Sequence, residues 1–185
     1  MQHPRALGLA GWSGSGKTTL LVQLIPVLVK RGLRVATIKR AHHEFDVDVP
    51  GKDSYEHRKA GAAEVLICSS SRWVQMHELA GEAEPSLDEL LRRVSPCDLI
   101  LIEGFKRERH PKLEIYRPAL GKPALYPDDP AIVAVATDAP LAAPHPPRVD
   151  LNDIAAVADC VLMHAVPLPE VLALLQRQGT ASQES

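Results

Sequence analysis

The residues most able to do chemistry in this sequence form a short glycine-rich segment near its N-terminus. The segment fits the pattern G-x-x-x-x-G-K-[ST] and consists of Gly11, Trp12, Ser13, Gly14, Ser15, Gly16, Lys17 and Thr18, followed by Thr19. Glycines allow backbone N–H groups to turn toward an anion with no side chain in the way. Lys17 would reach the β- and γ-phosphates of a nucleoside triphosphate, and the Thr18 hydroxyl would contact Mg²⁺. The pattern predicts a phosphate-binding loop, called here the phosphate loop (residues 11–18).

A phosphate loop needs a strand before it and a helix after it, because the unpaired N–H groups and the positive end of the helix then face the phosphates. Residues 6–10 form an apolar run that is typical of a strand covered on both faces. Residues 17–31 carry leucines at helical spacing, and Pro26 is expected to kink that helix or to force its local hydrogen bonds to rearrange. Both flanking elements are predicted, which favours a phosphate loop over a Gly/Ser-rich turn with an incidental lysine.

The rest of the chain alternates between strand-like and helix-like patterns. This alternation predicts an α/β protein with the P-loop NTPase fold, a mostly parallel sheet with helices on both faces and an antiparallel edge extension. Strands are expected at residues 34–39, 64–68, 72–79, 99–102 and 132–136, and helices at residues 53–61, 86–94, 152–164 and 169–178. Asp53 or Ser54 should cap the first of these helices, and Asn152-Asp153 should cap the third. No proline-rich segment separates two core-sized halves, so we expect one nucleotide-binding domain over residues 1–185.

Charged residues lie at the carboxyl ends of three of the predicted strands besides the one that leads into the phosphate loop. They are Lys39, Glu103 and Asp138. Ligands of open parallel sheets bind beyond the carboxyl ends of the strands, so these side chains should converge. Glu103 is expected to hold Mg²⁺ together with Thr18, the alternative being a strand-end acid satisfied by local amides. Lys39 would counter phosphate charge.

The polar loop at residues 40–54 is expected near the γ-phosphate end of a bound nucleotide and resembles a switch segment. Asp46, Asp48 or Asp53 would orient the attacking water or complete the magnesium shell. His42 and His43 form a second candidate metal site. Neighbouring residues of an extended loop point apart, and no cysteine lies near, so a structural role is favoured for this pair.

Composition limits the remaining classes of function. The formal net charge of -2 provides no general attraction to nucleic acid or to an anionic membrane. The three cysteines are far apart and form no Cys-x-x-Cys pair, which favours a reducing compartment. No apolar run approaches the roughly 20 residues of a membrane span. We therefore expect a cytoplasmic protein without a nucleic-acid or membrane partner.

Several segments together resemble one family, the molybdopterin-guanine dinucleotide biosynthesis adapter proteins (MobB). The phosphate loop with its flanks is similar to the first conserved segment of that family. The segments that carry the resemblance are residues 10–21, 38–39, 42–43, 46–48, 50–54, 59–62, 99–106, 134–138 and 151–154. The resemblance covers most of the chain, from about residue 7 to about residue 161.

This resemblance implies a GTP-binding protein with weak or slow GTPase activity that uses Mg²⁺. The family's proposed role is to assist the enzyme that joins GMP to molybdopterin, with molybdopterin itself or a molybdoenzyme as further candidate partners. Members are typically homodimers. Carried over residue by residue, the resemblance supports the phosphate loop, Thr18 and Glu103 strongly and residues 46–54 more loosely.

Two features depart from the expected patterns. The family often has histidine where this chain has Arg40, and the guanine-reading Asn-Lys-x-Asp tetrapeptide is absent. Guanine preference therefore rests on the resemblance. Asp138 lies where a carboxylate would accept hydrogen bonds from the guanine ring N–H and the exocyclic amine, which makes it a candidate nucleotide-binding residue by position.

Two other classes of function remain as alternatives. A small-molecule kinase would use the same phosphate loop, but it should carry a compact arginine-rich lid, whereas the arginines here are scattered. A nucleotide-binding module without turnover is the second alternative. The partner-binding surface is not visible in the sequence; Phe105, Lys106, Arg107 and Arg109 are candidates, and a plain exposed basic loop is the competing interpretation.

Overall fold

The computed structural model describes residues 3–41 and 45–183, which form two compact units. The first unit consists of Met1–Arg40 and Leu87–Ser185, and the second unit is Ala41–Ser86. The first unit contains the phosphate loop and the large sheet, whereas the second unit contains most of the polar loop that was expected to act as a switch.

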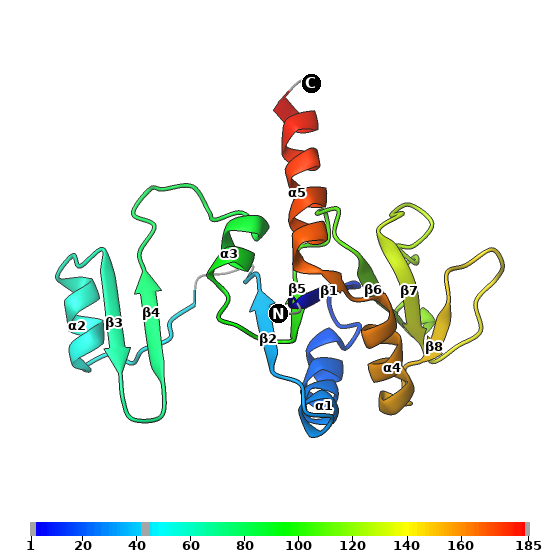
Figure 1. The fold of residues 1–185 in the computed structure, drawn as a ribbon, viewed down its shortest axis with the longest axis horizontal. Helices are drawn as coiled ribbons and strands as arrows, with labels where there is room; N and C mark the ends of the chain where they lie inside the picture. The colour runs from blue at the N-terminus through cyan, green and yellow to red at the C-terminus, as the bar shows by residue number, and fades with distance from the viewer. Residues whose placement is uncertain (1–2, 42–44, 184–185) are drawn as a thin grey trace. The chain divides into compact units, whose positions relative to one another are not determined.

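The first unit is built on a parallel sheet, visible edge-on in Figure 1. Its strands lie in the order β2-β5-β1-β6-β7-β8, and the two-residue strand β9 pairs antiparallel with β1. The bounds are β1 Arg5–Ala10, β2 Val35–Lys39, β5 Leu99–Glu103, β6 Lys112–Tyr116, β7 Ile132–Thr137, β8 Arg148–Asp150 and β9 Val166–Pro167. The predicted parallel sheet is confirmed.

Helices cover both faces of this sheet, as predicted. Helices α1 (Lys17–Lys30) and α4 (Ile154–His164) lie on one face, and α3 (Leu87–Arg93) and α5 (Leu168–Gln183) lie on the other (Figure 1). Alternate residues of β5 enter different clusters, since Leu101 packs with the first pair of helices and Ile102 packs with the second. A strand covered on both faces needs apolar residues at every position, which explains the unbroken apolar run in the sequence.

The second unit consists of α2 (Asp53–Lys59) and an antiparallel pair, β3 (Glu64–Cys68) and β4 (Trp73–His77). The antiparallel pair is confirmed, and it forms a sheet of its own. Val65 and Met76 face each other across the pair and are buried. On the opposite face Leu66 is 67% exposed and Trp73 is 63% exposed, so two apolar side chains are accessible there beside the polar Glu64, Gln75 and His77.

Some boundaries and caps differ from the sequence-based expectations. The short helix α2 begins at Asp53, and its N-cap is Lys52 without a side-chain hydrogen bond, so the expected cap at residue 53 or 54 is wrong. The cap of α4 is confirmed, because the Asp153 carboxylate accepts from the Ala156 N–H at 3.0 Å. Helix α1 runs through Pro26 to Lys30 as one helix.

Strand β6 was not predicted, because two charged residues interrupt its apolar pattern. Lys112 is 1% exposed and pairs with Asp129 at 2.9 Å. Glu114 is fully buried and accepts from the backbone N–H groups of Leu125 and Tyr126 at 2.7 and 2.9 Å. The pKa of Glu114 is raised, because the effect of burial exceeds the opposing effect of these two N–H groups. Both charged side chains thus attach the β6–β7 connection to the sheet.

His110 is a third buried polar side chain beside β6, and it should make stability depend on pH. It is 2% exposed, and burial, together with Lys112, lowers its pKa from 6.5 to about 3. Between these values the unfolded chain binds a proton that the folded chain does not, so acid favours unfolding. The free energy of unfolding should fall by about 1.4 kcal/mol for each pH unit below 6.5.

Urea unfolding at pH 7 and pH 5 measures this dependence. The wild-type protein should lose about 2 kcal/mol from this group over that interval, and the His110→Phe variant should lack that loss. Other titrating groups are common to both proteins, so the difference between their two pH slopes isolates the imidazole. Equal slopes would show that His110 titrates normally in the folded chain.

Candidate phosphate-binding site

The phosphate loop joins the end of β1 to the start of α1, as the sequence predicts. Gly16 is the N-cap of α1 with φ 94° and ψ 20°, in the left-handed region that favours glycine. No side chain caps α1, and its first turn holds no acidic residue. The first-turn N–H groups and the positive end of this 14-residue helix are therefore available to an anion.

Close packing inside the loop explains its first glycine. A Cβ at Gly11 would lie 2.6 Å from the Ile115 carbonyl oxygen and 2.7 Å from Ser15 Oγ. Ser15 is 1% exposed, and its Oγ has no hydrogen-bond partner among residues 3–41 and 45–183. A buried hydroxyl without a partner is uncommon in proteins and suits a site that is completed by a ligand.

Lys17 folds its ammonium group back into the loop. Its Nζ donates to the carbonyl oxygens of Gly11 at 2.8 Å and Trp12 at 3.0 Å. Burial lowers the Lys17 pKa, Glu103 raises it, and the cations Lys106 and Lys39 lower it. The loop thus holds a half-buried cation among further positive charges, an arrangement that favours a polyanion.

Thr18 and Glu103 meet at the side of the loop that faces β5. The Thr18 hydroxyl donates to Glu103 Oε1 at 3.2 Å, and Glu103 is 8% exposed. Lys39 is the register partner of Glu103 in the pairing of β2 with β5, so the ends of the two strands lie side by side. A hydroxyl and a carboxylate are hard oxygen ligands of the kind that Mg²⁺ prefers. These residues fit the predicted metal.

On the other side of the loop, Asp138 follows β7 and is bound by an arginine that the sequence did not reveal. Arg117 Nη1 donates to Asp138 Oδ2, and Arg117 Nε donates to the Ser15 carbonyl oxygen at 3.2 Å. Arg117 follows β6 directly, so missing that strand also hid this residue. Asp138 therefore lies on the sheet edge that carries the phosphate loop, as its position in the sequence suggested.

Trp12 projects from the loop and is flanked by cations. Its indole Nε1 donates to the Pro123 carbonyl oxygen at 2.8 Å. The Nζ atoms of Lys106 and Lys122 lie 5.2 and 6.0 Å from the ring centroid, within cation–π range. Phe105, a candidate for the partner surface, is instead 5% exposed and belongs to the core, so that expectation is wrong for this residue.

The three candidate carboxylates of the polar loop lie in the second unit. Asp46 and Asp48 both bind Arg58, at 2.8 and 2.5 Å, and Glu78 binds the same guanidinium at 2.9 Å. The Asp48 side chain is 6% exposed, and its hydrogen bond with Arg58 lowers its pKa. Asp53 is the exposed first residue of α2.

Other candidate features add no ligand site. His42 and His43 lie outside the described residues. Within residues 3–41 and 45–183, no cluster of three or more histidine, cysteine or acidic residues could hold a metal ion. Nor does that part of the chain contain a helix with the length and apolar character to cross a membrane.

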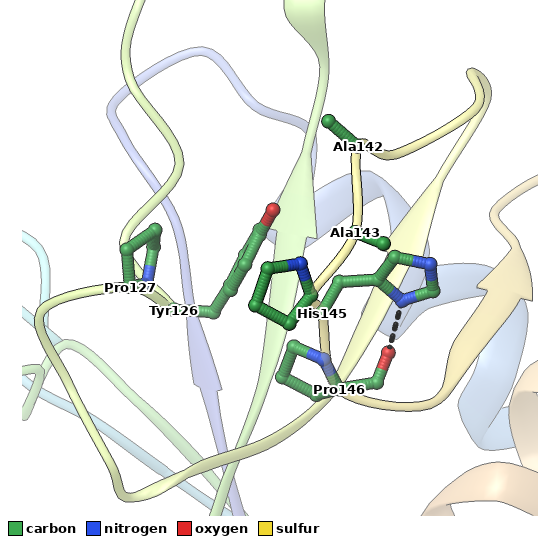
Figure 2. Close-up of a pocket in the computed structure, with 7 residues that line it drawn as sticks. Tyr126, Pro127, Ala142, Ala143, His145 and Pro146 are labelled. Carbon is green, nitrogen blue, oxygen red and sulfur yellow. Dashed lines mark hydrogen bonds between the residues drawn. The ribbon is translucent and has the colours of Figure 1, made fainter.

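One open pocket of about 580 Å³ lies between two proline-rich loops (Figure 2). It is lined by Tyr126, Pro127, Ala142, Ala143, Pro144, His145 and Pro146. The Tyr126 ring and the His145 imidazole are its polar side chains, and His145 Nδ1 lies 2.7 Å from the Pro146 carbonyl oxygen. None of the residues predicted to bind nucleotide or metal lines this pocket.

The chain has the P-loop NTPase fold. This class of protein is defined by the order of the strands, by the phosphate loop and by the carboxylate on the neighbouring strand. The family model described as "Molybdopterin guanine dinucleotide synthesis protein B" (MobB) matches residues 6–138, and the chain belongs to this family. The family resemblance inferred from the sequence is thereby confirmed.

Two similar proteins carry the name molybdopterin-guanine dinucleotide biosynthesis adapter protein. That of Escherichia coli (strain K12) is 47% identical over 159 residues, which cover 84% of this chain and 90% of the relative. That of Haemophilus influenzae is 42% identical over 157 residues, covering 84% of this chain and 86% of the relative. A crystal structure of a molybdopterin-guanine biosynthesis protein B aligns with a TM-score of 0.67 at 28% identity, covering 85% of this chain and 97% of the other.

Proposed function

We propose that this chain is a GTP-binding adapter in the biosynthesis of molybdopterin-guanine dinucleotide. It would assist the enzyme that transfers GMP to molybdopterin and would hydrolyse GTP slowly. The names of the relatives support the adapter role. The observation that carries the nucleotide role is the phosphate loop itself, where the Lys17 ammonium lies beside the start of α1 together with a Ser15 hydroxyl that has no hydrogen-bond partner in the described part of the chain.

Within this proposal each residue of the site has a role that follows from its contacts. Lys17 would exchange its two carbonyl partners for phosphate oxygens. Thr18 and Glu103 would hold Mg²⁺, which when bound neutralises charge on the β- and γ-phosphates. Asp138 would accept hydrogen bonds from the guanine ring N–H and the 2-amino group.

For hydrolysis we propose one of the three candidate carboxylates, Asp46, Asp48 or Asp53. Asp46 and Asp48 are engaged by Arg58, whereas Asp53 is exposed at the start of α2. We therefore favour Asp53 for orienting the attacking water. Phosphate release from Asp53→Asn, compared with Asp46→Asn, separates the two assignments, and equal rates in these variants would remove the preference.

Calorimetry with GTP, GDP and ATP analogues, with and without Mg²⁺, tests the proposal. We expect Mg²⁺ to tighten binding of a GTP analogue by about 10-fold or more, because Thr18 and Glu103 would hold the ion and it would neutralise phosphate charge. The Glu103→Gln variant should lose most of this dependence, and Glu170→Gln, an exposed glutamate of α5, should keep it. Tight ATP binding with no response to GTP would contradict the guanine assignment. If the protein with ATP rapidly phosphorylated a small-molecule acceptor, the kinase alternative would be favoured instead.

We further propose that the protein is a homodimer. Two exposed apolar side chains of the second unit support this, because Leu66 and Trp73 lie on one face of a two-stranded sheet that leaves them in water. Light scattering of the full chain gives the oligomeric state directly, and a monomer at micromolar concentration would refute the proposal.

A further inference from the structure

Arg117 touches two parts of the first unit that would contact opposite ends of a nucleotide. Its Nε donates to the carbonyl oxygen of Ser15 in the phosphate loop at 3.2 Å, and its Nη1 donates to the Asp138 carboxylate. The residues before this pair, Tyr116 and Thr137, are register partners of β6 and β7. The two charged side chains therefore leave the sheet side by side, and one guanidinium connects the loop to the end of β7.

The sheet order indicates which end of a nucleotide lies over Arg117, and this step rests on the proposed function. Glu103 and Lys39 are the last residues of β5 and β2, which lie on one side of β1, and β6 and β7 lie on the other side. The magnesium and γ-phosphate end belongs beside Glu103, which contacts Thr18. The nucleoside must then extend from the phosphate loop toward the ends of β6 and β7, where Arg117 and Asp138 lie.

The pair is also accessible to a ligand. The Arg117 side chain is 36% exposed and that of Asp138 is 28% exposed, so a nucleobase can reach the carboxylate while the guanidinium remains attached to it. Only Asp138 Oδ2 is bound to Arg117 in the structure, and a carboxylate has about four acceptor positions on its two oxygens. Enough acceptor capacity remains for two N–H donors of a purine.

We propose that Arg117 is a positioning residue for the nucleobase, which fixes the Asp138 carboxylate at a set distance from the phosphate loop. Two physical reasons support this role. A planar guanidinium can bind a carbonyl and a carboxylate in fixed directions, whereas a lysine ammonium cannot hold the same geometry. In addition, an unpaired carboxylate near a triphosphate would repel it, and the arginine charge offsets this repulsion.

Calorimetric binding of GDP and IDP tests this role, because hypoxanthine lacks the 2-amino group of guanine. The wild-type protein should prefer GDP by about 10-fold, the effect of one hydrogen bond to a charged acceptor. In Arg117→Ala the preference should fall to about twofold or less, close to that of Asp138→Ala. Arg117→Lys should fail to restore it, and the double variant should show no further loss because the two residues act as one unit.

The matched control is Arg31→Ala, which removes an arginine that pairs with Asp159 at 2.6 Å at the far end of α1. It should keep the wild-type preference. If Arg117 had only a structural role, replacing it would lower the affinities for GDP and IDP equally. An unchanged ratio of GDP affinity to IDP affinity in both Arg117 variants would therefore overturn the inference. If Arg117→Ala does not fold, Asp138→Asn breaks the same ion pair by removing the carboxylate charge. An unchanged GDP/IDP ratio in that variant would also overturn the inference.

The wild-type measurement separates this inference from the proposed function. A protein that binds GDP, IDP and ADP equally would contradict both the guanine assignment and the role of Arg117. A protein that prefers GDP, with a preference that survives in Arg117→Ala and Arg117→Lys, would contradict the role of Arg117 alone.

Discussion

Replacing Lys17 with alanine should weaken binding of a GTP analogue by about 100-fold and binding of GDP by about 10-fold. The ammonium lies inside the phosphate loop, within hydrogen-bond distance of the Gly11 and Trp12 carbonyl oxygens. A bound triphosphate would bring the β- and γ-phosphate oxygens to that charge, whereas a diphosphate lacks the γ-phosphate. The loss should therefore be larger for the triphosphate, and calorimetry on both ligands measures the difference.

Lys30→Ala is the matched control, because Lys30 is the last residue of the same helix and lies at its opposite end. Nucleotide affinity should be unchanged in that variant. Thermal unfolding should show that both variants fold, since the hydrogen bonds of Lys17 involve only carbonyl oxygens of its own loop. Unchanged GTP affinity in Lys17→Ala would contradict the phosphate role of the loop.

Replacing Gly8 with alanine should destabilise the protein by about 3 kcal/mol, the upper part of the range for overpacked cores. A Cβ there would lie 2.2 Å from His110 Nε2 and 2.7 Å from His110 Cδ2. His110 is 2% exposed and has little room to move. Unlike Gly11 and Gly16, Gly8 does not have a positive φ, so alanine meets no backbone strain and the cost comes from the collision alone.

Urea unfolding of the single and double variants isolates that collision. His110→Ala removes the imidazole, so adding Gly8→Ala to it should cost much less than adding Gly8→Ala to the wild type. The added methyl group would then occupy space that the imidazole vacates. A cost below about 0.5 kcal/mol for Gly8→Ala in the wild-type background would show that the imidazole can move aside.

The sequence was sufficient for the elements whose patterns are local. The phosphate loop has a fixed spacing, and β5 is an unbroken apolar run because both of its faces are covered. Strand β6 could not be predicted, because Lys112 and Glu114 are polar residues whose partners lie 17 and 11 residues away. Burial of a charge depends on such distant partners, which no local pattern reveals.

The same distinction between local patterns and distant partners applies to the residues of the candidate site. Lys17, Thr18 and Glu103 could be placed together from strand ends alone, since the carboxyl ends of parallel strands share one edge. The pairing of Asp48 with Arg58 could not be foreseen, because it depends on how α2 packs within the second unit. Arg117 was missed because the strand before it was missed.

Trp12 places an intrinsic fluorophore in the phosphate loop. The chain has only two tryptophans, and the other, Trp73, lies in the second unit. The indole of Trp12 is hydrogen-bonded through Nε1 and stands beside the ammonium groups of Lys106 and Lys122. Indole emission is sensitive to nearby charge, so a change of anion in the loop should alter fluorescence at this ring. With Trp73 replaced by phenylalanine, the occupancy of the loop could be followed in real time without any attached dye.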